Sequence, residues 1–320
     1  MINGSNESQF AVDFELHRRE LHVHCYRMLG SFEEAEDVVQ EAFARAWARR
    51  ETFTPGSNLR AWLYRIATNA CLDAIRRSKR RVPSMHSFAE VPWLQPYPDR
   101  LLDELDPNTM VVARESIALA FIAMIQLLSP KQRAVLLLRD VVGWSAGETA
   151  VLLEMTVASA NSALQRARAT LQQARAVGRT ETRALQLSER ERELLSAFIE
   201  THERGNAERA LALVREDIRV TMPPLPWCFD GREALAPLMR QAFGPDSSGE
   251  WRLVPIRANR MPAALSYLRA PQDTEFRAFK IDVLRVEGDL IAEITTFDAR
   301  LDVHPRLAFM LAQFGLPPTM

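Results

Sequence analysis

The chain has few of the features that mark secreted, membrane-inserted or disulfide-stapled proteins. Its three cysteines, Cys25, Cys71 and Cys228, are far apart and match no CxxC spacing, which argues against a disulfide framework or a zinc finger. The longest apolar stretch, residues 117–128, contains Gln126 and is too short to span a bilayer. The N-terminus lacks a basic segment followed by an apolar one. We therefore expect a protein of the reducing cytoplasm with no membrane segment.

An excess of charge of either sign is also missing, since the net charge is −1. Apolar residues make up 47% and charged residues 25% of the chain, which excludes collagen-like and wholly disordered classes. A length of 320 residues predicts two or three domains. A net charge near zero can still include clusters of like charge. The local distribution of charges, and not their total, therefore indicates whether the chain binds nucleic acid.

The hydrophobic period divides the chain into three parts. Helical periodicity runs from about residue 14 to 81 and again from about 113 to 176. Between them, residues 82–112 contain five prolines and lose the period, which predicts an extended linker. Beyond residue 187 the chain predicts helices and then antiparallel strands, an α+β domain. The expected helices are 189–204 and 207–214; the expected strands lie at 218–222, 251–258 and within 276–297, with a hairpin turn at 287–289.

The first helical block separates its charges. Gly30 ends one helix, and Ser31 with Glu34 begins the next as a capping box. Between residues 33 and 41 there are five acids and no base. This acidic face is either a solvated surface favoured by the helix dipole or a docking face for a basic partner. The apolar side that should face the core comprises Ala35, Val38, Val39, Ala42, Phe43 and Ala46.

The next helix reverses the sign. From Asn58 to Arg81 there are seven bases and one acid, Asp73, a cluster suited to neutralising phosphates. The alternative is a core tryptophan beside an ordinary basic surface. One stripe of this helix combines an aromatic ring, an amide, an acid and two guanidiniums, which can stack on a base and bind its edge. It consists of Trp62, Arg65, Asn69, Asp73 and Arg76.

The second helical block predicts a helix-turn-helix. Capping signals at Ser129 and Ser145 begin two helices, and Thr156 begins a third that contains no acid up to Arg175. The small polar residues at its start, followed by arginines, suit insertion into the major groove; a generic pair of helices is the alternative. Val157, Ala160, Leu164, Ala167 and Leu171 should face inward. The outward set is Ala158, Ser159, Asn161, Ser162, Gln165, Arg166, Arg168 and Ala169.

The C-terminal part offers candidates for a pocket but no catalytic motif. Asp230, Glu293, Asp298 and His304 are the available acids and bases, and catalysis is the less favoured interpretation. Trp227, Phe229, Trp251 and Phe297 would line a small-ligand cavity or, more often, a core. The tail places Leu307, Met310, Leu311 and Phe314 on one helical face that should dock. His22 and Cys25 share a helix face, but two ligands do not make a zinc site, so we expect no metal and no cofactor.

Two segments resemble a known family. The stretch HRRELHVHCYRMLGSFEEAEDVVQEAFARAW with FTPGSNLRAWLYRIATNACLDAIRRSKRR resembles region 2 of the extracytoplasmic-function (ECF) sigma factors, the promoter-recognition subunits of bacterial RNA polymerase. The resemblance implies that Asp37, Gln40 and Glu41 meet the β′ clamp helices of the polymerase. It also implies that the loop 53–58 accepts a base flipped from the −10 element. The residues expected at the −10 element are Phe53, Asn58, Trp62, Arg65, Asn69, Asp73, Arg76 and Arg77.

The segment LSPKQRAVLLLRDVVGWSAGETAVLLEMTVASANSALQRARATL resembles region 4 of the same family, which reads the −35 element and meets the β flap. Ala160 and Asn161 depart from the usual residues, which leaves the exact −35 sequence open. The residues expected to contact it are Thr156, Ala158, Ser159, Asn161, Ser162, Gln165, Arg166 and Arg168. Pieces such as RVTMPPLPWCFDGREAL resemble the SnoaL-type NTF2-like domains, implying a cone of helices against a curved sheet that modulates the sigma portion.

We therefore expect a multidomain, cytoplasmic, non-enzymatic sigma factor that binds core RNA polymerase and promoter DNA. Two all-α domains would precede an α+β NTF2-like domain that contacts the linker or region 2. The alternatives are a ligand-responsive helix-turn-helix regulator that is not a polymerase subunit, and an NTF2-like enzyme tethered to DNA. The expected boundaries are region 2 at 10–81, linker 82–112, region 4 at 113–178, NTF2-like domain 184–301 and tail 302–320.

Overall fold

The protein forms two compact units in the computed structural model. The first holds residues 1–85, 104–116 and 120–181, and the second holds residues 86–103, 117–119 and 182–320. The structure describes residues 3–54, 57–79, 91–104, 117–175, 187–244, 247–300, 303–304 and 306–320. Arg80, Arg81 and two residues of the 53–58 loop lie outside the described residues.

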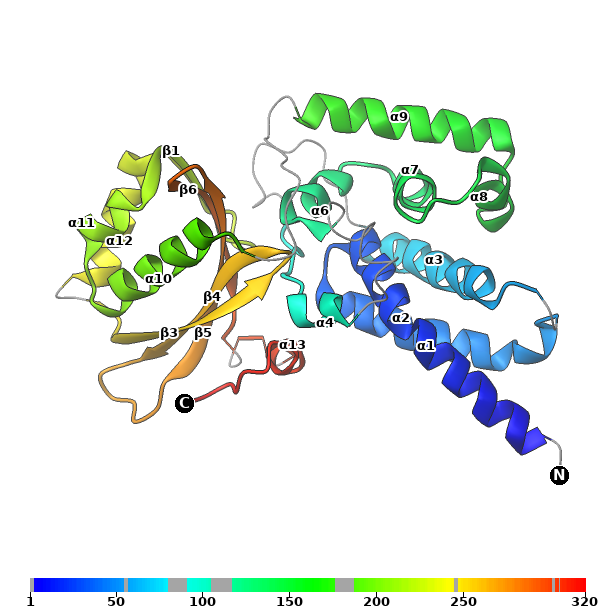
Figure 1. Ribbon diagram of the computed structural model, residues 1–320, viewed down its shortest axis with the longest axis horizontal. Coiled ribbons are helices and arrows are strands. Elements are labelled where there is room, and N and C mark those ends of the chain that lie inside the picture. The colour runs from blue at the N-terminus through cyan, green and yellow to red at the C-terminus, as the bar shows by residue number, and fades with distance from the viewer. Residues whose placement is uncertain are drawn as a thin grey trace. The chain divides into compact units, whose positions relative to one another are not determined.

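Three long helices make the first half of unit 1: α1 (Asn3–Leu29), α2 (Phe32–Ala48) and α3 (Leu59–Ser78) (Figure 1). The predicted boundary between α1 and α2 is confirmed. Gly30 adopts φ +76°, its N–H donates to Tyr26 O at 2.7 Å, and the Ser31 hydroxyl accepts from the Glu34 N–H at 3.3 Å. These contacts satisfy backbone groups that a helix end leaves open, so the chain turns sharply there.

The apolar side of α2 packs into the bundle as its period predicts. Ala35, Val38, Val39, Ala42 and Ala46 are buried, while Phe43 is half-buried against Phe14 of α1, with ring centroids 4.7 Å apart. The core also encloses two histidines. His24 is fully buried with Nε2 2.9 Å from Thr68 Oγ1, and burial lowers the pKa values of His22 and His24 to about 3. Both imidazoles are therefore neutral in the folded protein.

The second half of unit 1 is a set of short helices that ends in one long helix: α6 (Leu119–Ile125), α7 (Pro130–Leu136), a π-helical turn η4 (Leu137–Val141), α8 (Ala146–Leu152) and α9 (Val157–Arg175). The Ser145 hydroxyl accepts from the Glu148 N–H at 3.1 Å, and the Glu148 carboxylate accepts from the Ser145 N–H at 2.7 Å. The predicted capping box of α8 is thus confirmed.

Helix α9 buries Ala160, Leu164, Ala167 and Leu171 as predicted. The same prediction is wrong for Val157, which is 47% exposed. Val157 lies in the first turn of the helix, where the chain has just left the turn after α8 and has not reached the core. The apolar period alone does not show that the first turn of a helix lies outside the core.

A buried cation joins the two halves of unit 1. The Arg133 guanidinium of α7 donates to the carbonyl oxygens of Met28, at the end of α1, and of Ile125, at the end of α6, the latter at 2.9 Å. It also donates to Gln126 Oε1 at 2.6 Å. Burial lowers the pKa of Arg133 to about 9, which still leaves the side chain charged at neutral pH. The partial negative charge at helix C-termini compensates a cation in this position.

Unit 2 is built on a six-stranded sheet with the order β2-β1-β6-β5-β4-β3. The predicted strand regions are confirmed, and so is the hairpin turn, with Gly288 at φ +57° between β5 and β6. Two further strands were not predicted: Cys228–Asp230 has only three residues, and Met261–Arg269 gives no alternating signal because its first seven residues are all buried. The strands are β1 (Val214–Thr221), β2 (Cys228–Asp230), β3 (Glu250–Ala258), β4 (Met261–Arg269), β5 (Arg277–Glu287) and β6 (Leu290–Asp298).

The expectation of antiparallel strands throughout is wrong for one pair, because β1 runs parallel to β6. Between these two strands the chain passes through β2, a helix and the three strands β3 to β5, so the last strand returns beside the first in the same direction. Such a crossover is what a parallel pair requires. The result is a mixed sheet rather than a purely antiparallel one.

Helices α10 (Glu189–Glu203), α11 (Ala207–Ala212) and α12 (Arg232–Phe243) lie against one face of this sheet (Figure 1). Phe198 of α10 and Leu235 of α12 share a core with Ile218, Leu284 and Ile294 of the strands. Apolar burial of this kind stabilises by about 25 cal/mol per Å² removed from water. The helices therefore cover the sheet and complete the α+β architecture.

The C-terminal tail docks as predicted. Helix α13 (Leu307–Gln313) buries Leu307, Met310 and Leu311, while Phe314 after its end is only half-buried. The final residues pair with the start of β5. Phe276 and Met320 exchange two backbone hydrogen bonds of 2.9 Å. Across the described ranges of the chain, no helix combines the length and the apolar character needed to cross a bilayer.

The neutral histidines predict an acid-sensitive bundle. Because the pKa of His24 is lower in the folded state than in the unfolded state, the unfolded chain binds the proton first as the pH falls below about 6.5. The free energy of unfolding should then fall by about 1.4 kcal/mol per pH unit for each such histidine, down toward the folded-state pKa of about 3.

Between about pH 6 and about pH 5, His24→Gln should reduce the slope of the free energy of unfolding against pH by about 1.4 kcal/mol per pH unit, as measured by urea unfolding. His304→Gln, an exposed histidine with 41% side-chain exposure, is the control and should retain the wild-type slope. An unchanged slope in His24→Gln would contradict the assignment of a neutral buried imidazole.

Candidate nucleic-acid and polymerase interfaces

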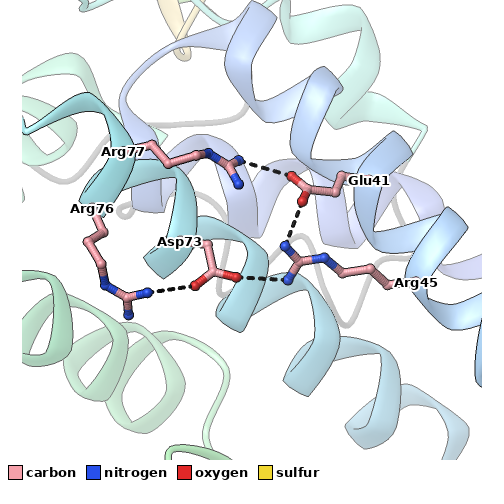
Figure 2. A network of polar contacts seen from close by, with 5 residues as sticks. All are labelled: Glu41, Arg45, Asp73, Arg76 and Arg77. Atoms are coloured by element: carbon pink, nitrogen blue, oxygen red, sulfur yellow. Dashed lines mark hydrogen bonds and ion pairs between the residues drawn. The ribbon is translucent and has the colours of Figure 1, made fainter.

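Five charged side chains link α2 to α3 in an alternating chain (Figure 2). Arg45 lies between two acids, 2.6 Å from Glu41 and 3.0 Å from Asp73. Glu41 also pairs with Arg77 at 3.2 Å, and Asp73 with Arg76 at 3.0 Å. Partial burial raises the pKa of Glu41, but hydrogen bonds from Arg77 and Arg45 outweigh burial and keep it below its ordinary value. The network is therefore ionised at neutral pH.

The three residues predicted to face the polymerase do not have the same environment. Asp37 and Gln40 are exposed on α2, one turn apart, and the Gln40 amide donates to Glu36 Oε1 at 3.0 Å. The Glu41 side chain is only 33% exposed and belongs to the network with α3. Asp37 and Gln40 therefore present the accessible part of this face, and Glu41 joins α2 to α3 through its ion pair with Arg77.

A pocket of about 280 Å³ opens beside the same helices. It contains the predicted Trp62, Arg65 and Asn69 of α3, and the ring of Phe53 lies 5.4 Å from that of Trp62. An aromatic face, an amide and guanidiniums around one cavity can hold a planar base and its phosphate. The full lining is Arg45, Arg49, Thr52, Trp62, Arg65, Ile66, Asn69 and Glu154.

Other residues predicted for this site have different positions. Asn58 caps α3, because its side-chain oxygen accepts from the Ala61 N–H at 3.0 Å. Asp73 belongs to the ion-pair network with Arg76 and Arg77 rather than to the pocket lining. Sequence reasoning missed Arg45 and Arg49, which reach the pocket from α2 and its C-cap. The available signal was their spacing of four residues, which places both on one side of that helix.

The helix-turn-helix presents its predicted outer face. Thr156 begins α9, since its hydroxyl accepts from the Ser159 N–H at 3.1 Å, and both residues are exposed. Arg168 is held by Asp140 through two hydrogen bonds of 2.7 and 2.9 Å. The remaining predicted contact residues are all exposed: Ala158, Asn161, Ser162, Gln165 and Arg166.

In unit 2 the tip of the β3–β4 hairpin is bonded to part of the predicted linker. Asn259 and Arg260 form a two-residue turn with φ +53° and +62°, a conformation that favours glycine at both positions. The Asn259 carboxamide accepts from the Tyr97 N–H at 2.8 Å and donates to Ile117 O at 2.7 Å, while its own N–H donates to Tyr97 O at 2.9 Å. Tyr97 is completely buried. We call the turn 259–260 with residues 97–103 the linker clasp.

Charged residues complete the linker clasp. Residues Asp99–Asp103 form the short helix α4, and the Asp99 carboxylate accepts from the Arg260 N–H at 2.7 Å and pairs with Arg257 at 3.1 Å. The Arg260 guanidinium, 2% exposed, also pairs with Asp103. Burial raises the pKa of Asp99 to about 6, against the opposing effect of both arginines. Residues 97–103 of the linker are thus folded onto the sheet instead of being extended.

The four candidate catalytic residues are engaged in ion pairs of their own. Asp230 pairs with an arginine of β1 at 3.2 Å, and Glu293 with an arginine of β5 at 2.9 Å. Asp298 is held by Arg300 at 2.6 Å and lies 4.0 Å from His304. Partial burial raises the pKa of Asp298, but the Arg300 hydrogen bonds outweigh it and lower the pKa. Asp298 therefore remains ionised at neutral pH and does not have the raised pKa of a general acid.

The four candidate pocket aromatics do not line one cavity. Trp227 is 52% exposed, whereas Phe229 and Trp251 pack against the core under the helices. Phe297 is buried on the opposite face of the sheet, because it is three residues from Ile294 and side chains alternate along a strand. This set belongs to the core and the surface.

Comparison with known proteins agrees with this division. Residues 14–81 match the Sigma-70 region 2 family, residues 118–171 the Sigma-70 region 4 family and residues 195–294 the SnoaL-like domain family. The ECF RNA polymerase sigma factor SigG of Mycobacterium tuberculosis is 39% identical over 324 residues, which cover 97% of this chain and 85% of SigG. SigW of Bacillus subtilis is 32% identical over 173 residues, covering 53% of this chain and 90% of SigW.

A solved structure has the same fold over nearly the whole chain. The crystal structure of the extracytoplasmic function sigma factor SigJ of Mycobacterium tuberculosis aligns with a TM-score of 0.60 at 20% identity, covering 92% of this chain and 98% of SigJ. At that identity the alignment supports the fold of the helical and mixed-sheet parts.

Proposed function

The chain belongs to the ECF RNA polymerase sigma factors, and we propose that it binds core RNA polymerase and directs transcription initiation at specific promoters. The observation that carries this proposal is the pairing, in one chain, of a base-sized aromatic and basic pocket with an exposed helix-turn-helix face. Each would be a weak indication by itself. Together they suit the two promoter elements that such a factor contacts.

On the polymerase side, Asp37 and Gln40 offer an acidic and a polar group on the exposed surface of α2. We propose that they meet the basic face of the β′ clamp helices. Glu41 supports them indirectly, because its ion pairs with Arg45 and Arg77 hold α2 against α3. Complementary charge of this kind mainly sets orientation and association rate.

On the DNA side, the pocket around Trp62 would receive one unstacked base of the −10 element. Asn69 supplies an amide for the base edge, and Arg49 and Arg65 supply positive charge for the adjacent phosphates. Unstacking a base costs a few kcal/mol, which stacking on an aromatic ring offsets by about 1–3 kcal/mol per base. Strand opening would thereby be coupled to sequence reading.

At the −35 element, α9 would enter the major groove with its small exposed residues in front. Ser159 and Ala158 allow close approach, Gln165 and Asn161 reach base edges, and Arg166 binds phosphate. Arg168 is oriented by its two hydrogen bonds to Asp140. Some of these groups would position α9 on the DNA, and the others would specify the −35 base sequence.

The C-terminal domain would modulate the sigma modules through the linker clasp. A linker bonded to the β3–β4 turn through Tyr97 and Asp99 has a shorter free length between the two DNA-reading modules. We propose that this restraint limits how the modules spread over core polymerase. The paired states of Asp230, Glu293 and Asp298 favour this binding role over a catalytic one.

Reversing the charge at Asp37 tests the polymerase interface. Asp37→Lys should weaken binding to core RNA polymerase by roughly tenfold or more, because a like charge would then face the clamp helices. Glu15→Lys changes an acid of α1 whose side chain is 67% exposed, and it is the matched control. The measurements are affinity for core polymerase and promoter-specific transcripts. Normal polymerase binding by Asp37→Lys would refute the assigned interface.

Two variants separate phosphate contacts from base contacts. The double variant Arg76→Ala with Arg77→Ala should weaken promoter binding for all sequences and lower the salt-dependence slope by roughly one to two. Gln165→Ala should instead relax the preference at one −35 position, worth about 1–3 kcal/mol, and leave the slope nearly unchanged. Holoenzyme binding over a series of salt concentrations and base changes measures both. If both variants changed the salt slope and the base preference alike, the assignment of Arg76 and Arg77 to phosphates and of Gln165 to a base would be wrong.

The linker clasp is tested by Asn259→Gly, which keeps a residue suited to positive φ but deletes the carboxamide. Loss of the hydrogen bond from the Tyr97 N–H should raise amide exchange at Tyr97 by roughly tenfold. Freed from the restraint, the variant should give more promoter-specific transcript with core polymerase. Asn206→Gly, which removes a helix-capping amide elsewhere in unit 2, is the control. Faster exchange with unchanged transcription would refute the regulatory role.

A further inference from the structure

A carboxylate from the helix-turn-helix lies at the base pocket of α3. Glu154 belongs to the turn between α8 and α9, and its Oε1 is 2.7 Å from Arg65 Nη2. It lines the pocket together with Trp62, Asn69 and Arg49. Glu154 is the acid of this lining, and it comes from the module that reads the other promoter element. Both residues belong to the same compact unit of the protein.

The backbone at Glu154 is a second, independent observation. Its φ is +52°, in the left-handed region that glycine and asparagine adopt most easily. A glutamate there is strained. Its side chain is also 73% exposed, so it gains little from packing. What the position does provide is a carboxylate directed at a guanidinium of the pocket.

A DNA phosphate is the natural competitor for that guanidinium. Phosphate and carboxylate are both anions that accept hydrogen bonds from arginine in the same planar geometry. Resting on the proposed function, we infer that Glu154 is an internal anion that occupies the phosphate position on Arg65, so that the −10 pocket binds DNA only after this turn has withdrawn. Region 4 would then block the DNA-binding pocket of region 2 until the two modules separate.

The ion pair between Glu154 and Arg65 is weak enough for a DNA phosphate to displace it. The Arg65 side chain is 46% exposed and that of Glu154 73%, and ion pairs this exposed contribute little to stability. The stable part of the docking lies elsewhere. Arg133 is buried and binds the Met28 carbonyl, and the Trp144 ring lies 5.4 Å from that of Tyr64. The buried contacts would hold the modules together, while Glu154 screens the pocket.

The test compares single-stranded DNA affinity of the full-length chain with and without the carboxylate. The probe is a fluorescein-labelled single-stranded DNA of random sequence, measured by anisotropy at low salt. Glu154→Gln should bind it more tightly by up to about fivefold, the equivalent of an exposed ion pair. Glu15→Gln removes the same charge from an exposed position on α1 and should bind like the wild type.

A second background shows whether Glu154 acts through Arg65. In Arg65→Ala the proposed competition has no target, so adding Glu154→Gln should leave the affinity unchanged. Equal affinity of Glu154→Gln and wild type would overturn the inference. So would an equal gain in Glu15→Gln, or a gain that persists with Arg65→Ala, since either is an effect of total charge.

The same preparations are also tested for binding to core RNA polymerase. A chain that does not bind polymerase refutes the proposed function. A chain that binds polymerase but shows no effect of Glu154→Gln refutes the lid alone.

Discussion

The buried guanidinium of Arg133 is the constraint on which the first unit depends. A fully desolvated cation is costly unless hydrogen bonds compensate it, and Arg133 finds its acceptors at the ends of α1 and α6. These acceptors belong to both helical modules, so satisfying one side chain brings the modules together. Glu154 contacts the pocket of α3 across the same pair of modules. A change in the docking of Arg133 is therefore expected to reach the pocket of α3.

The same unit uses its charges in two ways. Along the sequence, acids gather on α2 and bases on α3, which suggests two independent surfaces. In the folded chain Arg45 joins them, because it pairs with Glu41 on one side and Asp73 on the other (Figure 2). The proposed polymerase face and the proposed DNA face thus share one network of ion pairs. Binding at either face is expected to be sensitive to salt and to the geometry of the other.

The second unit binds part of the linker at the tip of its β3–β4 hairpin. Its candidate acids form ion pairs with arginines, whereas the strained turn at Asn259 and Arg260 binds the linker. Strained backbone persists where the surroundings over-determine it, and here the surroundings are Tyr97, Asp99 and Asp103. The hairpin tip is therefore the part of this domain that the linker contacts.

Local chemistry was readable from the sequence. Capping residues such as Ser31 and Ser145 have their partners three residues away, so the helix boundaries could be predicted and are confirmed. The exposed face of α9 follows from its period alone. The stripe of Trp62, Arg65 and Asn69 also lies within one helix, and these three residues do meet in one pocket.

What the sequence by itself determined is most of the helices and strands, and the side chains that each presents on one face; it did not predict α12, or α4 within the linker. Tertiary structure alone decided that Arg45 and Arg49 complete the pocket, that Glu154 lies against Arg65, and that β1 pairs in parallel with β6. The reason is that these contacts join residues far apart in the chain. A periodic pattern records which face of an element is buried, but it carries no information about which other element covers that face.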